Sequence, residues 1–102
     1  MTDSFQDSDP VSEIRTLVSE IAQALVDDPD AVRVEAIMDQ DTAVLRLEVA
    51  PSDVGKVIGK QGRTARSLRT ILGAASMKHR RRFALDIIEA DERPDAEDAE
   101  LE

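Results

Sequence analysis

The stretch Gly59-Lys60-Gln61-Gly62 combines two glycines with a cation immediately ahead of an expected helix. Glycines accept positive φ and allow another backbone to approach closely, because they have no Cβ. The free amides and the positive dipole end at the start of a helix attract anions. Lys60 adds an ammonium, and Arg63 and Arg66 continue the positive charge along the helix. Together these features predict a site that holds successive phosphates of a nucleic-acid backbone.

The charges of the chain are segregated, and this loop lies in the basic part. The 102 residues carry a net charge of −9, yet residues 51–82 contain nine Lys and Arg against a single Asp. The remainder holds four basic and 21 acidic side chains. Such an asymmetry favours a surface that faces a polyanion more strongly than the overall acidity argues against one. A merely solvated basic face is the alternative.

The residue inventory argues against catalysis and against a cofactor. The chain has no Cys and a single His, His79, and its carboxylates cluster towards the two ends. Thiolate metal sites, Cys nucleophiles and catalytic triads therefore lack their parts. Gly55 and Gly59-Lys60-Gln61 fall one residue short of a nucleotide-binding P-loop, and Gln61 replaces the hydroxyl that would bind magnesium. We expect no enzyme activity, no metal and no cofactor.

The length and the ends of the chain predict one small domain with tails. About a hundred residues suffice for a single core. We expect a folded domain at residues 10–90 and disordered acidic tails at residues 1–9 and 91–102, because the tail composition buries too little apolar surface to order the chain. The start lacks the features of a signal peptide, and no stretch approaches the roughly 18 apolar residues of a membrane span. This predicts a cytoplasmic protein.

Hydrophobic periodicity predicts the elements of the domain. Asp9-Pro10 is expected to begin a helix whose apolar stripe runs to Leu25. The helix should end near residues 27–29, ahead of the proline. Alternation over residues 32–39 and 44–49 predicts two strands of an antiparallel hairpin. Residues 51–53 are expected to cap a short helix over 54–58, which Gly59 ends. A longer helix and a strand around residues 83–87 complete an α+β order, α-β-β-α-α-β.

The run from Val57 to Ala65 resembles the signature of a KH domain, in which a G-x-x-G loop between two helices clamps about four nucleotides of single-stranded nucleic acid. The helix-first order resembles the type II form of that fold. The small size is similar to the bacterial KhpA family of stand-alone KH RNA-binding proteins. The resemblance covers roughly residues 11–90 and implies a three-stranded sheet packed by helices on one face.

The resemblance also implies where RNA binds. The nucleic acid would lie in a groove formed by the two central helices, the loop and the strand over residues 46–49. The loop is the backbone clamp, and Val54, Ile58 and Ala65 are the apolar floor under the bases. The RNA-contacting residues expected in this interpretation are Val54, Lys56, Ile58, Gly59, Lys60, Gln61, Gly62, Arg63, Ala65 and Arg66. Because the chain has no Trp or Tyr, affinity is expected to rest on phosphates and to be sensitive to salt.

Partners and roles follow from the same resemblance. It implies an RNA chaperone or post-transcriptional regulator, present as a homodimer or as a heterodimer with a KhpB/Jag-like KH protein. The rival interpretation is a protein-interaction module of KH fold with weak or vestigial RNA binding, in which the helix surface around Gly73, Ala74 and Met77 docks a partner. The basic run at residues 78–82 is either a nucleic-acid patch or the charged entry to the last strand. The acidic C-terminal tail either solubilises the protein or competes with RNA for the basic groove.

Overall fold

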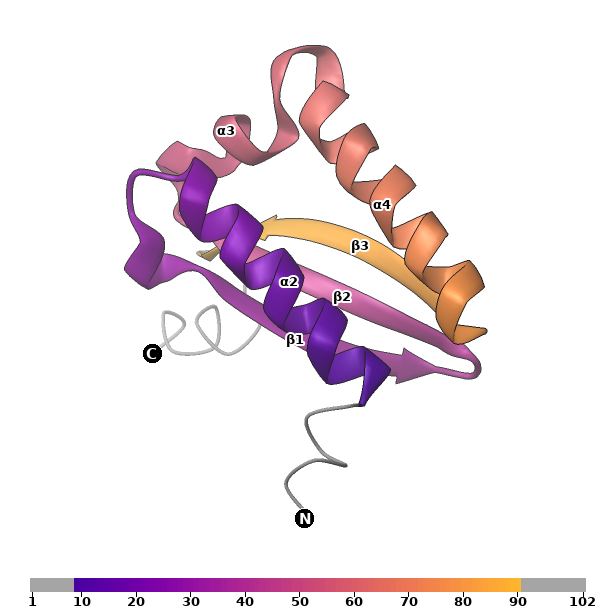
Figure 1. Ribbon diagram of the computed structural model, residues 1–102. Helices are drawn as coiled ribbons and strands as arrows, with labels where there is room; N and C mark the ends of the chain where they lie inside the picture. The colour runs from indigo at the N-terminus through magenta and orange to yellow at the C-terminus, as the bar shows by residue number, and fades with distance from the viewer. Residues whose placement is uncertain (1–8, 91–102) are drawn as a thin grey trace.

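Three helices lie over one face of a three-stranded sheet in the computed structural model, which describes residues 9–90 (Figure 1). The main elements follow the expected α-β-β-α-α-β order. They are α2 (Pro10–Leu25), β1 (Arg33–Asp39), β2 (Thr42–Val49), α3 (Val54–Ile58), α4 (Arg63–His79) and β3 (Arg82–Glu89), with short 3-10 turns η1 (Pro29–Ala31), η2 (Pro51–Asp53) and η3 (Lys60–Gly62). The tails expected at residues 1–9 and 91–102 lie outside the described residues, apart from Asp9.

Helix α2 begins and ends where local chemistry requires. The Asp9 side chain accepts a hydrogen bond from the Val11 amide at 3.3 Å, and Pro10 occupies the first helical position. The apolar stripe buries Ile14, Val18 and Ala22 against the sheet. The helix ends at Leu25, a few residues before Pro29, as expected for a chain approaching a proline.

The sheet has the order β1-β2-β3, so that β2 is the central strand. β1 pairs with β2 antiparallel, which confirms the predicted hairpin, whereas β3 pairs with β2 in parallel. Parallel neighbours need a long crossover connection, and here the segment that contains α3, the loop and α4 provides it. The glycine-containing loop therefore lies within the connection between two neighbouring parallel strands, β2 and β3.

The core lies between the sheet and the helices. Every second side chain of β2, at Ala43, Leu45, Leu47 and Val49, is fully buried on the helix-covered face. These side chains pack with the buried stripes of α2 and α4 and with Val57 of α3. The burial of α3 and α4 against one sheet holds both ends of the loop between them. The expected α+β fold with helices on one face is confirmed.

Candidate nucleic-acid interface

The loop between α3 and α4 lies at the end of the molecule farthest from the N-terminus of α2, as Figure 1 shows. Three of its four residues have positive φ: Gly59 (81°), Gln61 (56°) and Gly62 (75°). The Gly62 amide donates to the Gly59 carbonyl at 3.0 Å, and the Arg63 amide donates to the Lys60 carbonyl. The loop is therefore a tight turn whose carbonyls accept hydrogen bonds from the amides of Gly62 and Arg63.

This turn changes one detail of the predicted anion site. Free amides were expected at the start of α4, but the Arg63 amide already donates to the Lys60 carbonyl. A phosphate at this loop would depend more on cationic side chains than the sequence pattern indicates. Lys60, Arg63 and Arg66 are all exposed, and the Arg63 guanidinium donates to the Gln61 side-chain oxygen at 3.1 Å.

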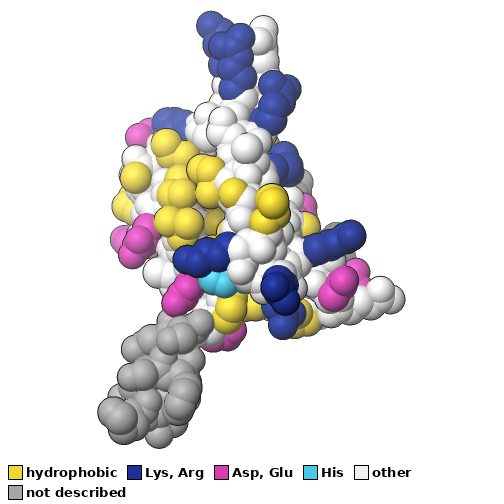
Figure 2. All heavy atoms as spheres, turned by 45° about the vertical axis from the view of Figure 1, so that its right-hand side comes forward, with side chains coloured by type: hydrophobic (Ala, Val, Ile, Leu, Met, Phe, Trp, Pro, Cys, Tyr) yellow, Lys and Arg dark blue, Asp and Glu magenta, His cyan; other side chains and the backbone are white. Residues whose placement is uncertain are grey.

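Lys and Arg side chains project from the end of the molecule that carries this loop, as the space-filling view in Figure 2 shows. Within residues 9–90, no carboxylate lies within ion-pair distance of Lys60, Arg63 or Arg66. Cations without a counter-charge in the protein create a positive field that attracts a polyanion. The loop thus combines two features. Another chain can approach its backbone, and its side chains are suited to binding phosphate.

The residues expected as an apolar floor are placed unevenly. Val54 and Ile58 of α3 are half-buried and can offer part of their surface beside the loop. Ala65 of α4 is only 3% exposed and faces the core. The floor that the structure offers is therefore formed mainly by α3.

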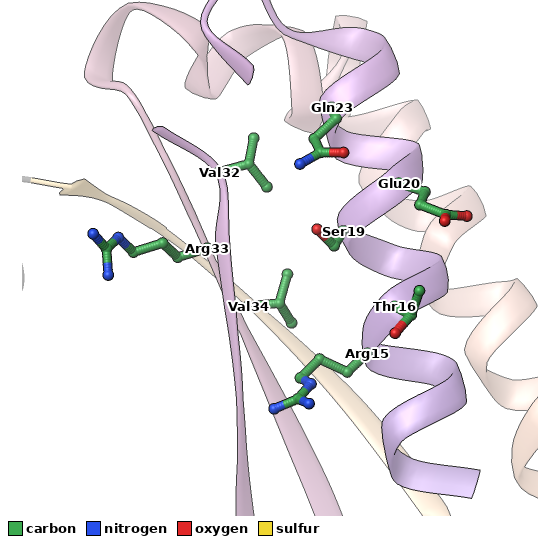
Figure 3. Close-up of a pocket in the computed structure, with 8 residues that line it drawn as sticks. All are labelled: Arg15, Thr16, Ser19, Glu20, Gln23, Val32, Arg33 and Val34. Carbon is green, nitrogen blue, oxygen red and sulfur yellow. The ribbon is translucent and has the colours of Figure 1, made fainter. Parts of the chain in front are cut away.

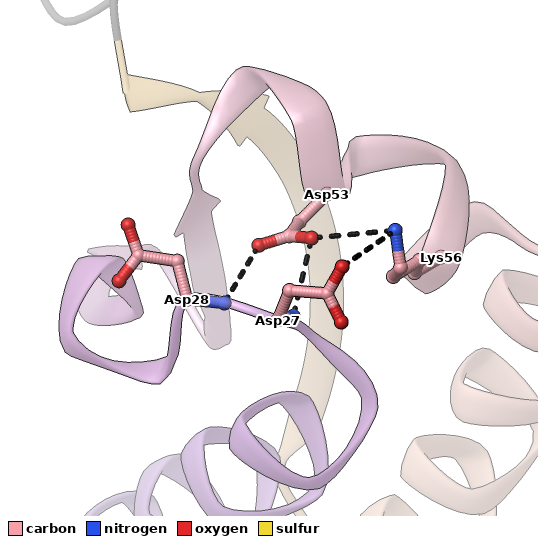
Figure 4. A network of polar contacts seen from close by, with 4 residues as sticks. All are labelled: Asp27, Asp28, Asp53 and Lys56. Carbon is pink, nitrogen blue, oxygen red and sulfur yellow. Dashed lines mark hydrogen bonds and ion pairs between the residues drawn. The ribbon is translucent and has the colours of Figure 1, made fainter.

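Lys56 is paired with two carboxylates. Its Nζ lies 3.3 Å from Asp27 Oδ2 and 3.6 Å from Asp53 Oδ1 (Figure 4). The hydrogen bond and charge of Asp27 raise the pKa of Lys56, with a smaller contribution from Asp53. Of the residues expected to contact RNA, Lys56 is the one whose charge is already paired within the protein.

Asp53 is the buried partner in this cluster, and its role differs from the prediction. Residues 51–53 were expected to cap α3, but the Asp53 carboxylate makes no capping hydrogen bond at the start of that helix. Its two oxygens accept instead from the amides of Asp27 (3.2 Å) and Asp28 (3.1 Å), as Figure 4 shows. The cap prediction was wrong because these partners lie 25 and 26 residues away in the chain, where local patterns carry no signal.

The balance of forces on Asp53 keeps it charged. Its side chain is only 1% exposed, and burial acts to raise the pKa. The hydrogen bonds from Asp27 and Asp28, together with Lys56, outweigh burial and hold the pKa of Asp53 below its ordinary value. We call Asp27, Asp28, Asp53 and Lys56 the clasp, because they join the end of α2 to the start of α3.

Comparison with known proteins identifies the family. The family model for the KH domain of KhpA and KhpB matches residues 15–87, which include the whole loop and both helices beside it. The chain belongs to the KhpA/KhpB KH-domain family. It is 54% identical over 76 residues to the RNA-binding protein KhpA of Halalkalibacterium halodurans, covering 74% of this chain and all of that protein.

Two further relatives agree with this assignment. The RNA-binding protein KhpA of Caldanaerobacter subterraneus subsp. tengcongensis is 51% identical over 72 residues, covering 71% of this chain and 96% of the relative. The protein of the same name from Aquifex aeolicus is 48% identical over 79 residues, covering 78% of this chain and all of the relative. No solved structure gives a significant match.

The strand that lies beside α4 in this KH domain differs from the strand that was expected to line the groove. The prediction named residues 46–49 of β2, but β2 is central, and Leu47, Glu48 and Val49 are buried. On the helix-free face, Arg46 forms an ion pair with Asp86 of β3 at 3.7 Å. The strand beside α4 is instead β3, which lies at the edge of the sheet (Figure 1). The hydrophobic pattern of a strand alone does not reveal whether the strand is central or lies at an edge of the sheet.

A second basic group of this KH domain lies at the far end of α4. Lys78, Arg80 and Arg82 are exposed around the turn into β3, where Arg80 has a positive φ of 55° and ends the helix. His79 packs edge-on against Phe83, with ring centroids 6.3 Å apart. Since α4 has 17 residues, this group lies about 25 Å from the loop. Figure 2 shows it around the histidine, well separated from the cations at the loop.

A shallow hollow lies on another side of the KH domain, between α2 and β1 (Figure 3). Its floor contains Val32 and Val34, and its walls carry polar and charged side chains. The lining residues are Arg15, Thr16, Ser19, Glu20, Gln23, Val32, Arg33 and Val34. None of the residues expected to contact RNA belongs to it.

Within residues 9–90, no group of three or more His, Asp or Glu side chains is placed to hold a metal ion. In the same part of the chain, no helix is long and apolar enough to cross a membrane.

Proposed function

We propose that this protein binds single-stranded RNA, with the Gly59–Gly62 loop against the sugar-phosphate backbone. The observation that carries the proposal is the positive-φ turn with three exposed cations beside it that pair with no described carboxylate, in a chain whose relatives are named RNA-binding proteins. A turn of this kind lets a phosphate backbone approach closely, and Lys60, Arg63 and Arg66 supply the charge.

The roles of the site residues follow from their positions. Gly59, Lys60, Gln61 and Gly62 form the backbone clamp, with phosphates also contacted by Arg63 and Arg66. Half-buried Val54 and Ile58 offer apolar surface to the bases, whereas buried Ala65 offers little. Lys56 contributes mainly through the clasp, which fixes α3 and so the start of the loop.

The protein acts in this proposal as a binder in the cytoplasm rather than as an enzyme, in the role of an RNA chaperone or post-transcriptional regulator. A single module that relies on phosphates binds weakly and releases RNA as salt rises. Pairing of two modules on one strand raises the affinity without new contacts. We therefore include self-association, or association with a KhpB/Jag-like KH protein, in the proposal.

The second candidate function is a protein-interaction module that docks a partner on the outward face of α4. Met77 is 83% exposed, and Ile71 of the same helix is also exposed. Nothing lies within 4 Å of the position that a Cβ on Gly73 would take, so another backbone has room to approach. This surface also suits the proposed self-association, so the two candidates differ in whether RNA binds at the loop.

The deciding experiment is fluorescence anisotropy of a labelled, unstructured RNA at low and moderate salt. The wild type is compared with the double variant Lys60→Asp, Gln61→Asp. The matched control is Arg15→Asp, Thr16→Asp, which makes the same change in net charge at the hollow between α2 and β1. We expect salt-dependent binding that the loop variant loses and the control retains.

Two other results would reject the proposal. Equal losses in both double variants would show a response to net charge alone, without a defined clamp. Failure of the wild type to bind any RNA, together with capture of a second protein on α4, would favour the interaction module.

A further inference from the structure

Helix α4 is fastened to the edge of β3 by two side chains. Ser76 Oγ accepts a hydrogen bond from the Phe83 amide at 3.1 Å, close to the turn that joins the two elements. One strand repeat further on, Arg69 Nη2 donates to the Leu85 carbonyl at 3.2 Å. Among the described residues, no other hydrogen bond ties α4 to β3. Of the two hydrogen bonds between α4 and β3, the one from Arg69 therefore lies nearer to the loop.

One hydrogen bond holds the Arg69 guanidinium in place and leaves its other N–H donors available. A guanidinium carries five N–H donors and no acceptor, and Leu85 takes one of them. The residue is exposed, and within residues 9–90 no carboxylate pairs with it. A side chain held in place by one hydrogen bond loses less conformational entropy when it binds a ligand through its other donors.

Arg69 also stands at the right distance to meet a base. It follows Gly62 by seven residues, which is about 10 Å along the helix axis. In the binding mode proposed above, the bases lie against α3, and β3 is the strand that packs beside α4. Lys60, Arg63 and Arg66 lie nearer to the loop and suit phosphates, whereas Arg69 lies on the side of α4 that faces β3.

We infer that Arg69 determines base specificity by donating two hydrogen bonds to a base that presents two adjacent acceptors. Guanine offers O6 and N7, and cytosine offers O2 and N3. Adenine and uracil alternate donors with acceptors along their edges, so they match a donor-only fork poorly. This inference rests on the RNA binding proposed above and adds a preference for guanine and cytosine over adenine and uracil.

The first test measures the base preference of the wild-type chain. Anisotropy titrations use a uridine octamer and three octamers whose two central uridines are replaced by adenosines, cytidines or guanosines. We expect the cytidine or guanosine octamer, or both, to bind at least about fivefold more tightly than the other two, since a good bidentate pair discriminates by this factor or more. Equal binding of all four would overturn the inference but leave RNA binding intact. Binding of none would reject the proposed function itself.

The second test asks whether Arg69 causes the preference. Arg69→Lys keeps the charge and a donor for Leu85 but loses the planar fork, so the four affinities should converge to within about twofold, with uridine binding unchanged. Arg66→Lys is the matched control and should keep the preference, because a phosphate contact needs only the charge. A preference that survives Arg69→Lys would overturn the inference. So would an equal weakening for all four octamers, which is the result expected of a purely structural tie.

A measurement on the wild type guards against poor folding of the variant. The Nε–H resonance of Arg69, assigned from through-bond spectra, reports directly on the guanidinium. We expect it to shift with the cytidine or guanosine octamer at saturation and to stay nearly unchanged with the uridine octamer. A resonance that ignores every RNA would show that Arg69 takes no part in binding.

Discussion

Gly59 and Thr64 approach so closely that a Cβ on the glycine would lie within 2.3 Å of the threonine Oγ1 and 2.7 Å of its amide nitrogen. Gly59 has φ 81° and ψ 168°, a region that only glycine occupies readily. Gly62 also has positive φ, but nothing lies within 4 Å of its would-be Cβ. The two glycines of the loop therefore have different reasons to be there: one is required by packing and backbone, the other by backbone alone.

We predict that Gly59→Ala destabilises the protein by about 2–4 kcal/mol, whereas Gly62→Ala costs about 1 kcal/mol. Urea unfolding measures both. Thr64→Ala should not rescue Gly59→Ala, because the amide of residue 64 stays in the way. Gly55→Ala, in the open on α3, is the control and should be neutral or slightly stabilising. Equal losses at Gly59 and Gly62 would contradict the role assigned to Thr64.

The clasp predicts a pH dependence of stability. The pKa of Asp53 is lowered in the folded protein from an ordinary value of 3.8, so the charged form favours folding. This contribution is complete above pH 3.8 and is lost as the pH falls through the folded pKa. Asp53→Asn should be several degrees less heat-stable than the wild type at pH 7, and the difference should shrink below pH 4.

Thermal unfolding between pH 7 and pH 3 measures this difference. Asp30→Asn provides a control, because Asp30 is an exposed residue of the neighbouring turn η1 and forms no ion pair with a described residue. It should leave the pH profile unchanged. A gap between wild type and Asp53→Asn that stays constant down to pH 3 would contradict the clasp as a charge-dependent contact.

The edge position of β3 predicts where RNA perturbs the sheet. Chemical-shift mapping with an unstructured RNA should move amides of β3 between Phe83 and Ile87, on the side beside α4. The amides of Ala43, Leu45 and Leu47 should move little, because these three residues are fully buried and lie in the central strand. Larger shifts in β2 than in β3 would restore the original expectation for residues 46–49.

The features that the sequence predicted correctly are those with local causes. Asp9-Pro10 begins a helix through its own amides and fixed φ, and the alternation around Leu45 and Leu47 reflects one buried face. The glycine-containing loop is likewise visible, because positive φ at Gly59 and Gly62 selects glycine directly. Each signal lies within a few residues of the structure that it specifies.

The features that the sequence did not predict depend on contacts between distant segments. The parallel pairing of β2 with β3 makes β2 the central strand and places β3 at an edge beside α4, and nothing in either strand's pattern encodes this pairing. The clasp joins Asp53 to residues 25 and 26 positions earlier. Arg69 reads in the sequence as one more exposed cation, and only the fold brings it to the Leu85 carbonyl. These contacts give different roles to lysines and arginines that the sequence does not distinguish.

Lys60 and Lys56 provide the sharpest comparison of this kind. Both lie in the basic segment, but within residues 9–90 only Lys56 of the two is paired with carboxylates, those of Asp27 and Asp53. A cation that replaces counterions on single-stranded nucleic acid adds about 0.7 to the slope of log affinity against log salt. Lys60→Ala should therefore reduce the slope by about 0.7, from about 2 if Lys60, Arg63 and Arg66 each contact a phosphate. Lys56→Ala should leave the slope nearly unchanged, because the positive charge of Lys56 is already paired with carboxylates of the protein. Anisotropy at four or more salt concentrations measures both slopes, and equal reductions would show that RNA draws Lys56 out of the clasp.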